Sequence, residues 1–186
     1  MKDVEKMNKN KKLTHSELID KIYDIISPYF RHIFIEKRNG TNYIQIFDEK
    51  KLIENEQNRF KIANADMLVL DEKEKPLLII EPETSASPKT FGRSIPIYTI
   101  AQKVKIENKE YSIECPLLLL IVIPKQPEKG QKEHQLPDLE EKFKKTIDLK
   151  ESSLKDFAIC QIDALKPTLK RLFINNGYKE YGCYFD

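Results

Sequence analysis

Several features that would assign a protein to a well-known class are absent from this chain of 186 residues. Its three cysteines are an odd number without C-x-x-C spacing, which argues against both a disulfide framework and a zinc site. A reduced, cytoplasmic setting is therefore expected. The three histidines, His15, His32 and His134, also lack metal-ligand spacing, so no chemistry is predicted for them.

Long hydrophobic runs are missing as well. The longest, residues 117–123, is far shorter than the roughly 18 residues needed to span a bilayer. Residues 1–12 are too polar for a secretory signal and are expected to form a flexible, basic segment. The length and the 40% hydrophobic content favour a single domain over residues 1–186, with no membrane partner.

The chain has little excess of either charge. Its 32 Lys and Arg against 30 Asp and Glu leave a formal net charge of +2, so the overall charge indicates no partner. Residues 84–109 are an exception, because they contain five cations and one anion. This positive segment directly follows two closely spaced glutamates, Glu81 and Glu83.

The pattern of apolar residues predicts an α/β fold with a mixed β-sheet flanked by α-helices. A T-x-x-E capping box at Thr14 and Glu17 predicts a first helix that ends near Pro28. Two β-rich pairs follow, each predicted as a hairpin: residues 32–37 with 42–47, around Asn39-Gly40, and residues 65–71 with 76–83. Further elements are predicted as a helix starting near Ser94 and reaching Val104, a buried strand over 116–124, a helix over 136–147, a strand over 156–162 and a last helix from Pro167.

The second hairpin carries the residues that point to chemistry. Its second strand, "LLIIEPE", continues four apolar residues directly into Glu81 and Glu83. If the turn "EKEK" has an even number of loop residues, paired positions place Asp66 opposite Glu81, and residues two apart on one strand share a face. Asp66, Glu81 and Glu83 are then expected on one side of the sheet, although a shift by one residue would send Asp66 to the other side.

Three carboxylates this close together repel one another unless a cation or a proton compensates their charge. Magnesium is the expected cation, because it prefers oxygen ligands and is commonly shared between carboxylates and a substrate phosphate. Lys89 and Arg93, a few residues downstream, would then meet that phosphate. The arrangement favours metal-assisted hydrolysis of a phosphodiester.

Residues 14–123 resemble the PD-(D/E)XK nuclease superfamily, whose members have a restriction-endonuclease-like fold. The resemblance rests on Asp66 in "NADMLVL", where Ala65 replaces the usual Pro, and on Glu81-Pro82-Glu83, where Glu83 takes the place of the motif lysine. This is similar to the E-x-E variant of some restriction endonucleases, as are the following Thr84-Ser85 and the later Gly92-Arg93. The motif is short and degenerate, so its context carries the specificity.

The resemblance implies a role for each matching residue. Asp66, Glu81 and the main-chain carbonyl of Pro82 would bind one or two Mg²⁺ ions, while Glu83 would position or deprotonate the attacking water or hold a second ion. Glu17 of the first helix would assist, although it also completes the capping box. Lys89 is an alternative source of the missing cation. Ser85, Lys89 and Arg93 are the residues expected to contact nucleic acid.

The expected function is that of a Mg²⁺-dependent DNA endonuclease of type II restriction type, acting on double-stranded DNA as a homodimer. A nuclease of repair or mobile-element type is the alternative among enzymes. The alternative from another class is a catalytically silent, nuclease-like module that binds nucleic acid or a protein partner, because the motif lysine is missing.

Overall fold

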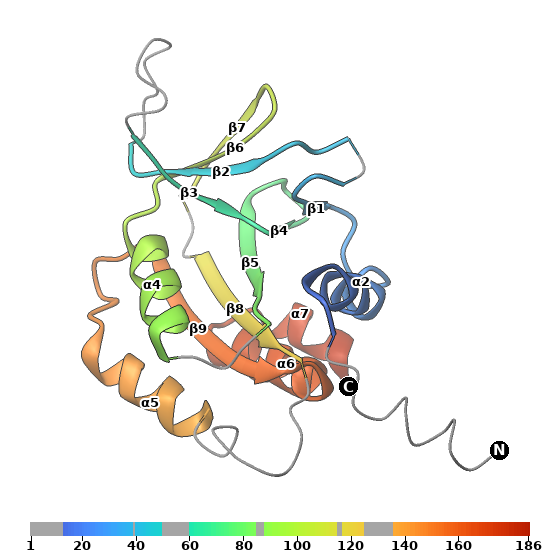
Figure 1. Ribbon diagram of the computed structural model, residues 1–186, viewed down its shortest axis with the longest axis vertical. Helices are drawn as coiled ribbons and strands as arrows, with labels where there is room; N and C mark the ends of the chain where they lie inside the picture. The colour runs from blue at the N-terminus through green and yellow to red at the C-terminus, as the bar shows by residue number, and fades with distance from the viewer. Residues whose placement is uncertain (1–12, 39, 50–59, 85–87, 115–116, 125–135) are drawn as a thin grey trace, which may run out of the picture.

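The computed structural model describes residues 13–38, 40–49, 60–84, 88–114, 117–124 and 136–186 (Figure 1). The basic segment expected at residues 1–12 lies outside them. The fold is mixed α/β, as the sequence pattern predicts, but it has two β-sheets where a single mixed sheet was expected. Within the described ranges, no helix is both long and apolar enough to cross a membrane.

The larger sheet has five strands in the order β1-β4-β5-β8-β9. Its β1–β4 and β4–β5 pairs are antiparallel, whereas its β5–β8 and β8–β9 pairs are parallel. Every residue of the two central strands β5 and β8 is buried, which explains their continuous apolar sequences. The strands span Ile33–Ile35 (β1), Met67–Leu70 (β4), Pro76–Pro82 (β5), Leu117–Ile123 (β8) and Leu154–Gln161 (β9).

The β4–β5 hairpin has the predicted register but a different turn. Met67 pairs with Ile80 and Leu68 with Ile79, so the next positions outward are Asp66 and Glu81. The turn itself is an odd loop, closed by a hydrogen bond from the Asp71 N–H to the Lys75 carbonyl. A bulge between Val69 and Leu70 adds one residue and restores the register. The expectation of an even loop was therefore wrong, while its consequence for Asp66 is confirmed.

Helices cover both faces of this sheet (Figure 1). On one face, apolar residues of α2 and α6 pack against alternate residues of the strands; on the other, α4 and α5 do the same. The predicted capping box is present at the start of α2, where Thr14 and Glu17 bond reciprocally. The helices span His15–Ile26 (α2), Pro88–Thr99 (α4), Leu136–Thr146 (α5), Leu165–Asn175 (α6) and Lys179–Gly182 (α7), with short 3-10 turns at Ile162–Ala164 (η4) and Cys183–Phe185 (η5).

The second sheet is antiparallel and has the order β3-β2-β6-β7. The hairpin predicted over residues 32–37 and 42–47 is wrong beyond its turn, because the Arg38–Thr41 bridge and a hydrogen bond from the Lys37 N–H to the Asn42 carbonyl join the two segments near the turn, after which they enter different sheets. The first segment then joins the larger sheet as β1, and the second joins the smaller sheet as β2. The strands span Ile44–Phe47 (β2), Lys61–Ala65 (β3), Lys103–Ile106 (β6) and Lys109–Ser112 (β7).

The helix after the second hairpin also differs from its prediction. It begins at Pro88, six residues before Ser94, and contains Pro96 in its interior. Val104 lies in β6 instead of this helix and is fully buried between the two sheets. The apolar spacing from Ile97 to Val104 was compatible with a helix, but Val104 pairs with Ile46 of β2 and is therefore a strand residue of the smaller sheet.

Glu140 of α5 ties this helix to the edge of the larger sheet. Its buried carboxylate accepts a hydrogen bond from the Ile159 N–H of edge strand β9 at 3.0 Å. Arg171 of α6 donates to both carboxylate oxygens, at 3.0 and 3.1 Å. Glu140 therefore satisfies a main-chain donor that an edge strand would otherwise leave for another strand to pair with.

We expect Glu140→Ala to lower the free energy of unfolding by about 1–3 kcal/mol, because the buried Ile159 N–H loses its acceptor. Arg171 is half exposed and can regain water, which limits the loss. Urea unfolding followed by circular dichroism measures the effect. Glu141→Ala is the matched control, since Glu141 is exposed and bonds only its helix neighbour Lys145, so its unfolding midpoint should match that of the wild type. Equal midpoints for both variants would contradict the proposed tether.

Candidate active site

The candidate active site lies where β4 begins and β5 ends. Asp66 occupies a bend between β3 and β4, and the hairpin register places it beside Glu81. Glu81 is only 9% exposed, because it continues the buried strand β5 and faces helix α4. Alternation along β5 gives Glu83 the same side of the strand as Glu81. The structure therefore brings the three predicted carboxylates to one place.

Glu81 is held by its neighbours in a largely dry environment. The hydroxyl of Tyr98, from the buried face of α4, donates a hydrogen bond to Oε1 of Glu81. Burial raises the pKa of Glu81 well above its ordinary value, and the charge of Asp66 and a hydrogen bond with Asp66 add to this rise. Tyr98 has the opposite, smaller effect on this pKa. The site thus favours a proton or a cation at Glu81.

Asp66 is connected to two segments that sequence reasoning left out of the site. Nε2 of His15, the first residue of α2, lies 3.2 Å from Oδ2 of Asp66. The main-chain N–H of Glu36, directly after β1, donates to the Asp66 carbonyl at 2.8 Å. His15 lies 51 positions from Asp66 in the chain, so no sequence spacing could have indicated their contact.

Glu83 lies at the open end of β5. Its N–H donates to the carbonyl of Val122 on β8 at 2.8 Å. Because the peptide bond is trans, the Pro82 carbonyl points in the opposite direction, toward the β4 side where Asp66 lies. Partial burial raises the pKa of Glu83, and the charge of Asp66 raises it further, whereas His15 lowers it. Glu83 is therefore close enough to Asp66 for their charges to interact, and the Pro82 carbonyl lies on the β4 side of the strand.

Glu36 is a fourth acidic residue at this site. Its Oε1 is buried and has no hydrogen-bond partner within the described residues. Burial raises the pKa of Tyr98 well above its ordinary value, and the charges of Glu81, Asp66 and Glu36 contribute to this rise. A buried carboxylate oxygen without a donor is costly, so it indicates a position suited to a cation. The residues around Glu36, "FIEK", are typical of any strand end, so the sequence did not indicate a functional role for Glu36.

The remaining predicted residues are Glu17, Lys89, Arg93 and Ser85. Glu17 accepts hydrogen bonds from the Thr14 N–H and hydroxyl, at 2.8 and 2.9 Å, as a capping-box partner does. Lys89 and Arg93 are exposed on α4, whereas its buried face carries Phe91, Ile95 and Tyr98. Ser85 lies outside the described residues.

Comparisons with known proteins do not assign this chain to a family. No family model, curated protein or solved structure matches this chain. Among the described residues, no three His, Cys, Asp or Glu side chains are arranged as a ready metal site. This agrees with the contacts above, because Tyr98 and His15 occupy oxygens of Glu81 and Asp66 in this arrangement.

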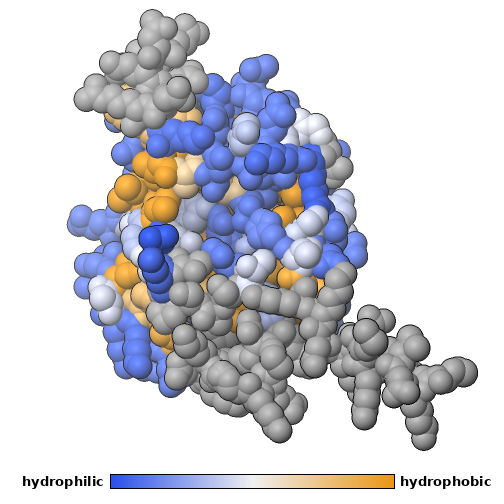
Figure 2. All heavy atoms as spheres, viewed as in Figure 1, coloured by the Kyte–Doolittle hydropathy of each residue, from blue (hydrophilic) through white to orange (hydrophobic). Residues whose placement is uncertain are grey.

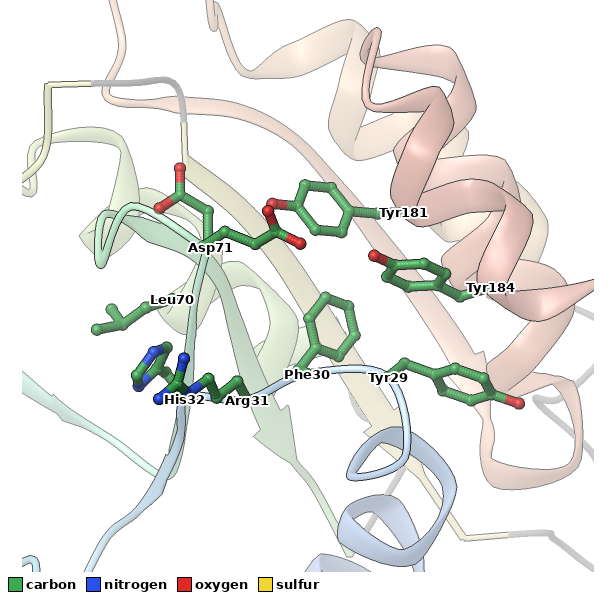
Figure 3. A pocket seen from close by; sticks show the side chains of 9 residues that line it. Tyr29, Phe30, Arg31, His32, Leu70, Asp71, Tyr181 and Tyr184 are labelled. Carbon is green, nitrogen blue, oxygen red and sulfur yellow. The ribbon is translucent and has the colours of Figure 1, made fainter.

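A separate cavity of about 330 Å³ lies at the other end of the β4–β5 hairpin (Figure 3). Leu70, at its wall, is four residues and roughly 13 Å along β4 from Asp66. Tyr181 and Tyr184 of the C-terminal segment line it and contact the Phe30 ring, with ring centroids 5.8 and 6.2 Å apart. The main chain of Glu72 donates a hydrogen bond to the Tyr181 hydroxyl, so this region fastens the C-terminal segment to the hairpin turn. The cavity is therefore separate from the carboxylates of the candidate active site.

The raised pKa of Glu81 predicts how stability depends on pH. The folded protein holds this proton more tightly than the unfolded chain, so the stabilisation is complete below the ordinary carboxyl pKa and is lost as pH rises through the folded pKa. In Glu81→Gln, the amide carbonyl can still accept from Tyr98 while the NH₂ donates to Asp66. We expect the stability of this variant not to fall as pH rises through this range. Without metal, the variant should therefore be more stable than the wild type at neutral pH.

Chemical unfolding at a series of pH values in EDTA measures this effect. Glu114→Gln is the control, because Glu114 is an exposed carboxylate paired with Lys75, and its curve should run parallel to that of the wild type. A Glu81→Gln curve that is also parallel to the wild type would show that Glu81 titrates normally.

Proposed function

We propose that this chain is a Mg²⁺-dependent endonuclease of restriction type that hydrolyses phosphodiester bonds in double-stranded DNA. The observation that carries the proposal is the meeting of Asp66 and Glu81 at neighbouring strand ends, with Glu83 next to them. Buried carboxylates with raised pKa values in such a cluster are more frequent at functional sites than elsewhere.

The topology supports a restriction-endonuclease-like fold of the PD-(D/E)XK type. A helix, α2, precedes the antiparallel β4–β5 hairpin, and a second helix, α4, connects β5 to the parallel strand β8. Asp66 directly precedes β4, Glu81 lies in β5 and Glu83 directly follows β5, which is the order that the motif requires. The second sheet is inserted around this arrangement, through β2 and β3 before Asp66 and through β6 and β7 after α4.

The donor set fits Mg²⁺. Asp66, Glu81 and the Pro82 carbonyl would hold the ion, and all three offer only oxygen atoms, which this cation prefers. The buried Oε1 of Glu36, which has no hydrogen-bond partner among the described residues, adds a further position that favours positive charge. When bound, Mg²⁺ supplies charge neutralisation at the phosphate and a lower pKa for water.

Glu83 is the residue we assign to the attacking water. Its raised pKa brings a carboxylate closer to the range in which a general base works at neutral pH. His15 is the basic side chain that contacts Asp66, whereas Lys89 is exposed on α4. We therefore assign the electrostatic role of the absent motif lysine to His15 and keep Lys89, Arg93 and Ser85 as contacts to DNA phosphates. A homodimer would place two such sites on the two DNA strands.

One observation favours the second candidate, a catalytically silent module that binds nucleic acid or a protein partner. The Tyr98 hydroxyl occupies Oε1 of Glu81, an oxygen that metal binding would use. A site of this kind can remain folded through hydrogen bonds alone, with no ion. Cleavage assays distinguish the two candidates.

We expect wild-type protein to cut plasmid DNA with Mg²⁺ and not with EDTA. Glu81→Gln and Asp66→Asn should each lower the cleavage rate by at least about 100-fold, because each removes a charged ligand of the ion. Glu114→Gln, which changes the same charge at an exposed carboxylate, should cut like the wild type. Retained DNA binding without any Mg²⁺-dependent cleavage would support the silent module instead.

The roles of Glu83 and Lys89 can be separated by kinetics. We expect Glu83→Gln to lower kcat by about 100-fold or more, because it removes the general base. Lys89→Ala should leave kcat unchanged and raise KM, since an exposed lysine on α4 contributes only to phosphate binding. Single-turnover cleavage of a plasmid measures the first value. A large loss of kcat in Lys89→Ala would instead assign the role of the missing motif lysine to Lys89.

A further inference from the structure

An exposed tyrosine lies between two lysines beside the candidate active site. Tyr43, directly before β2, is 45% exposed. The Lys37 Nζ lies 5.3 Å from the centroid of its ring, and the Lys61 Nζ lies 5.8 Å from it. These three residues are called the Tyr43 patch below. Figure 2 shows that the face of the molecule over β2, β6 and β7 is mostly hydrophilic.

The Tyr43 patch adjoins the carboxylates through the main chain. Ile44 of β2 pairs with Ala65 of β3, so the next position outward on these two strands is Tyr43 on one and Asp66 on the other. Lys37 directly follows Glu36, whose N–H donates to the Asp66 carbonyl. Tyr43 is therefore at the position across from Asp66, and Lys37 is the residue after Glu36.

The paired cations distinguish this ring from other aromatic residues. Elsewhere in the described chain, Tyr29, Tyr178 and Phe157 each have a single lysine over the ring. The two ammonium groups at Tyr43 lie no more than about 11 Å apart, a separation comparable to the screening length in physiological salt or shorter, so they repel each other. A bound anion relieves this repulsion, and a flat π-system can stack on the ring.

We propose that the Tyr43 patch binds a single-stranded segment of nucleic acid. A nucleobase stacks on the Tyr43 ring, while Lys37 and Lys61 move to the phosphates on either side of that base. Exposed aromatic rings combined with cations along the backbone are the usual means of binding single strands, because every base has a π-face. The inference rests on the proposed function for its substrate class and adds that an unpaired nucleotide is held next to the phosphate to be cut.

The test is binding of a fluorescent oligothymidylate of roughly 12 nucleotides, a length within the usual site sizes. It is followed by anisotropy in EDTA, so that no cleavage occurs. We expect Tyr43→Leu to weaken binding by about 5- to 150-fold, the range found for loss of one stacked base. Tyr43→Phe should bind within about twofold of the wild type, because it keeps the ring. Unchanged binding in Tyr43→Leu, or an equal loss in both variants, would overturn the stacking role.

Salt dependence tests the two lysines. In single strands, each neutralised phosphate contributes about 0.7 to the slope of log K against log salt, so Lys37→Gln/Lys61→Gln should reduce the magnitude of the slope by about 1.4. Lys166→Gln is the matched control, because Lys166 also lies over a tyrosine ring, that of Tyr29. An equal slope in the double variant and the wild type would overturn the phosphate contacts.

These measurements separate the inference from the proposed function. Tyr43-dependent binding without Mg²⁺-dependent cleavage would retain the patch and reject the nuclease. Cleavage that depends on Glu81 but not on Tyr43, together with unchanged oligothymidylate binding in Tyr43→Leu, would retain the nuclease and reject the patch.

Discussion

The burial of Glu81 is the constraint on which the rest of this site depends. The strand that carries it is buried on both faces, so its carboxylate leaves water and must be compensated within the protein. Tyr98 donates one hydrogen bond, but Asp66 and Glu83 bring further negative charge. Hydrogen bonds alone do not balance this charge, and the raised pKa of Glu81 is the result. A site built in this way has a place for a proton or a metal ion.

The position of this site follows from the way in which the two sheets join. Asp66 is the bend at which the chain leaves β3 of the smaller sheet and enters β4 of the larger one. One hydrophobic core extends across the contact, from Ile46 and Val104 to Leu68 and Ile79, and holds the sheets together. Segments from both sheets and from the start of α2 therefore converge on one aspartate. Rigid, buried elements suit a site that has to hold like charges close together.

Much of the fold could be predicted from local sequence, but its pairing could not. The capping box at Thr14, the buried run of β8 and the Glu81 register were all predicted, because local hydrogen bonding and apolar periodicity determine them. The strands that pair with β1 and β2 were not predicted. Asn39-Gly40 indicates a turn, but it does not determine whether the segments on either side pair with each other. For the site, the three carboxylates were found, whereas His15, Glu36 and Tyr98 come from distant segments and were missed.

By itself, the sequence determined that an acidic pair follows a strand too apolar to be exposed, and that an aspartate lies one hairpin register away. These are properties of neighbouring residues and of strand alternation, which a single chain displays directly. Only the tertiary structure decided what surrounds the carboxylates: a tyrosine from α4, a histidine from α2, and a glutamate whose buried oxygen has no partner in the described chain. Such neighbours depend on how helices and sheets pack, because contacts across many residues leave no periodic trace in the sequence.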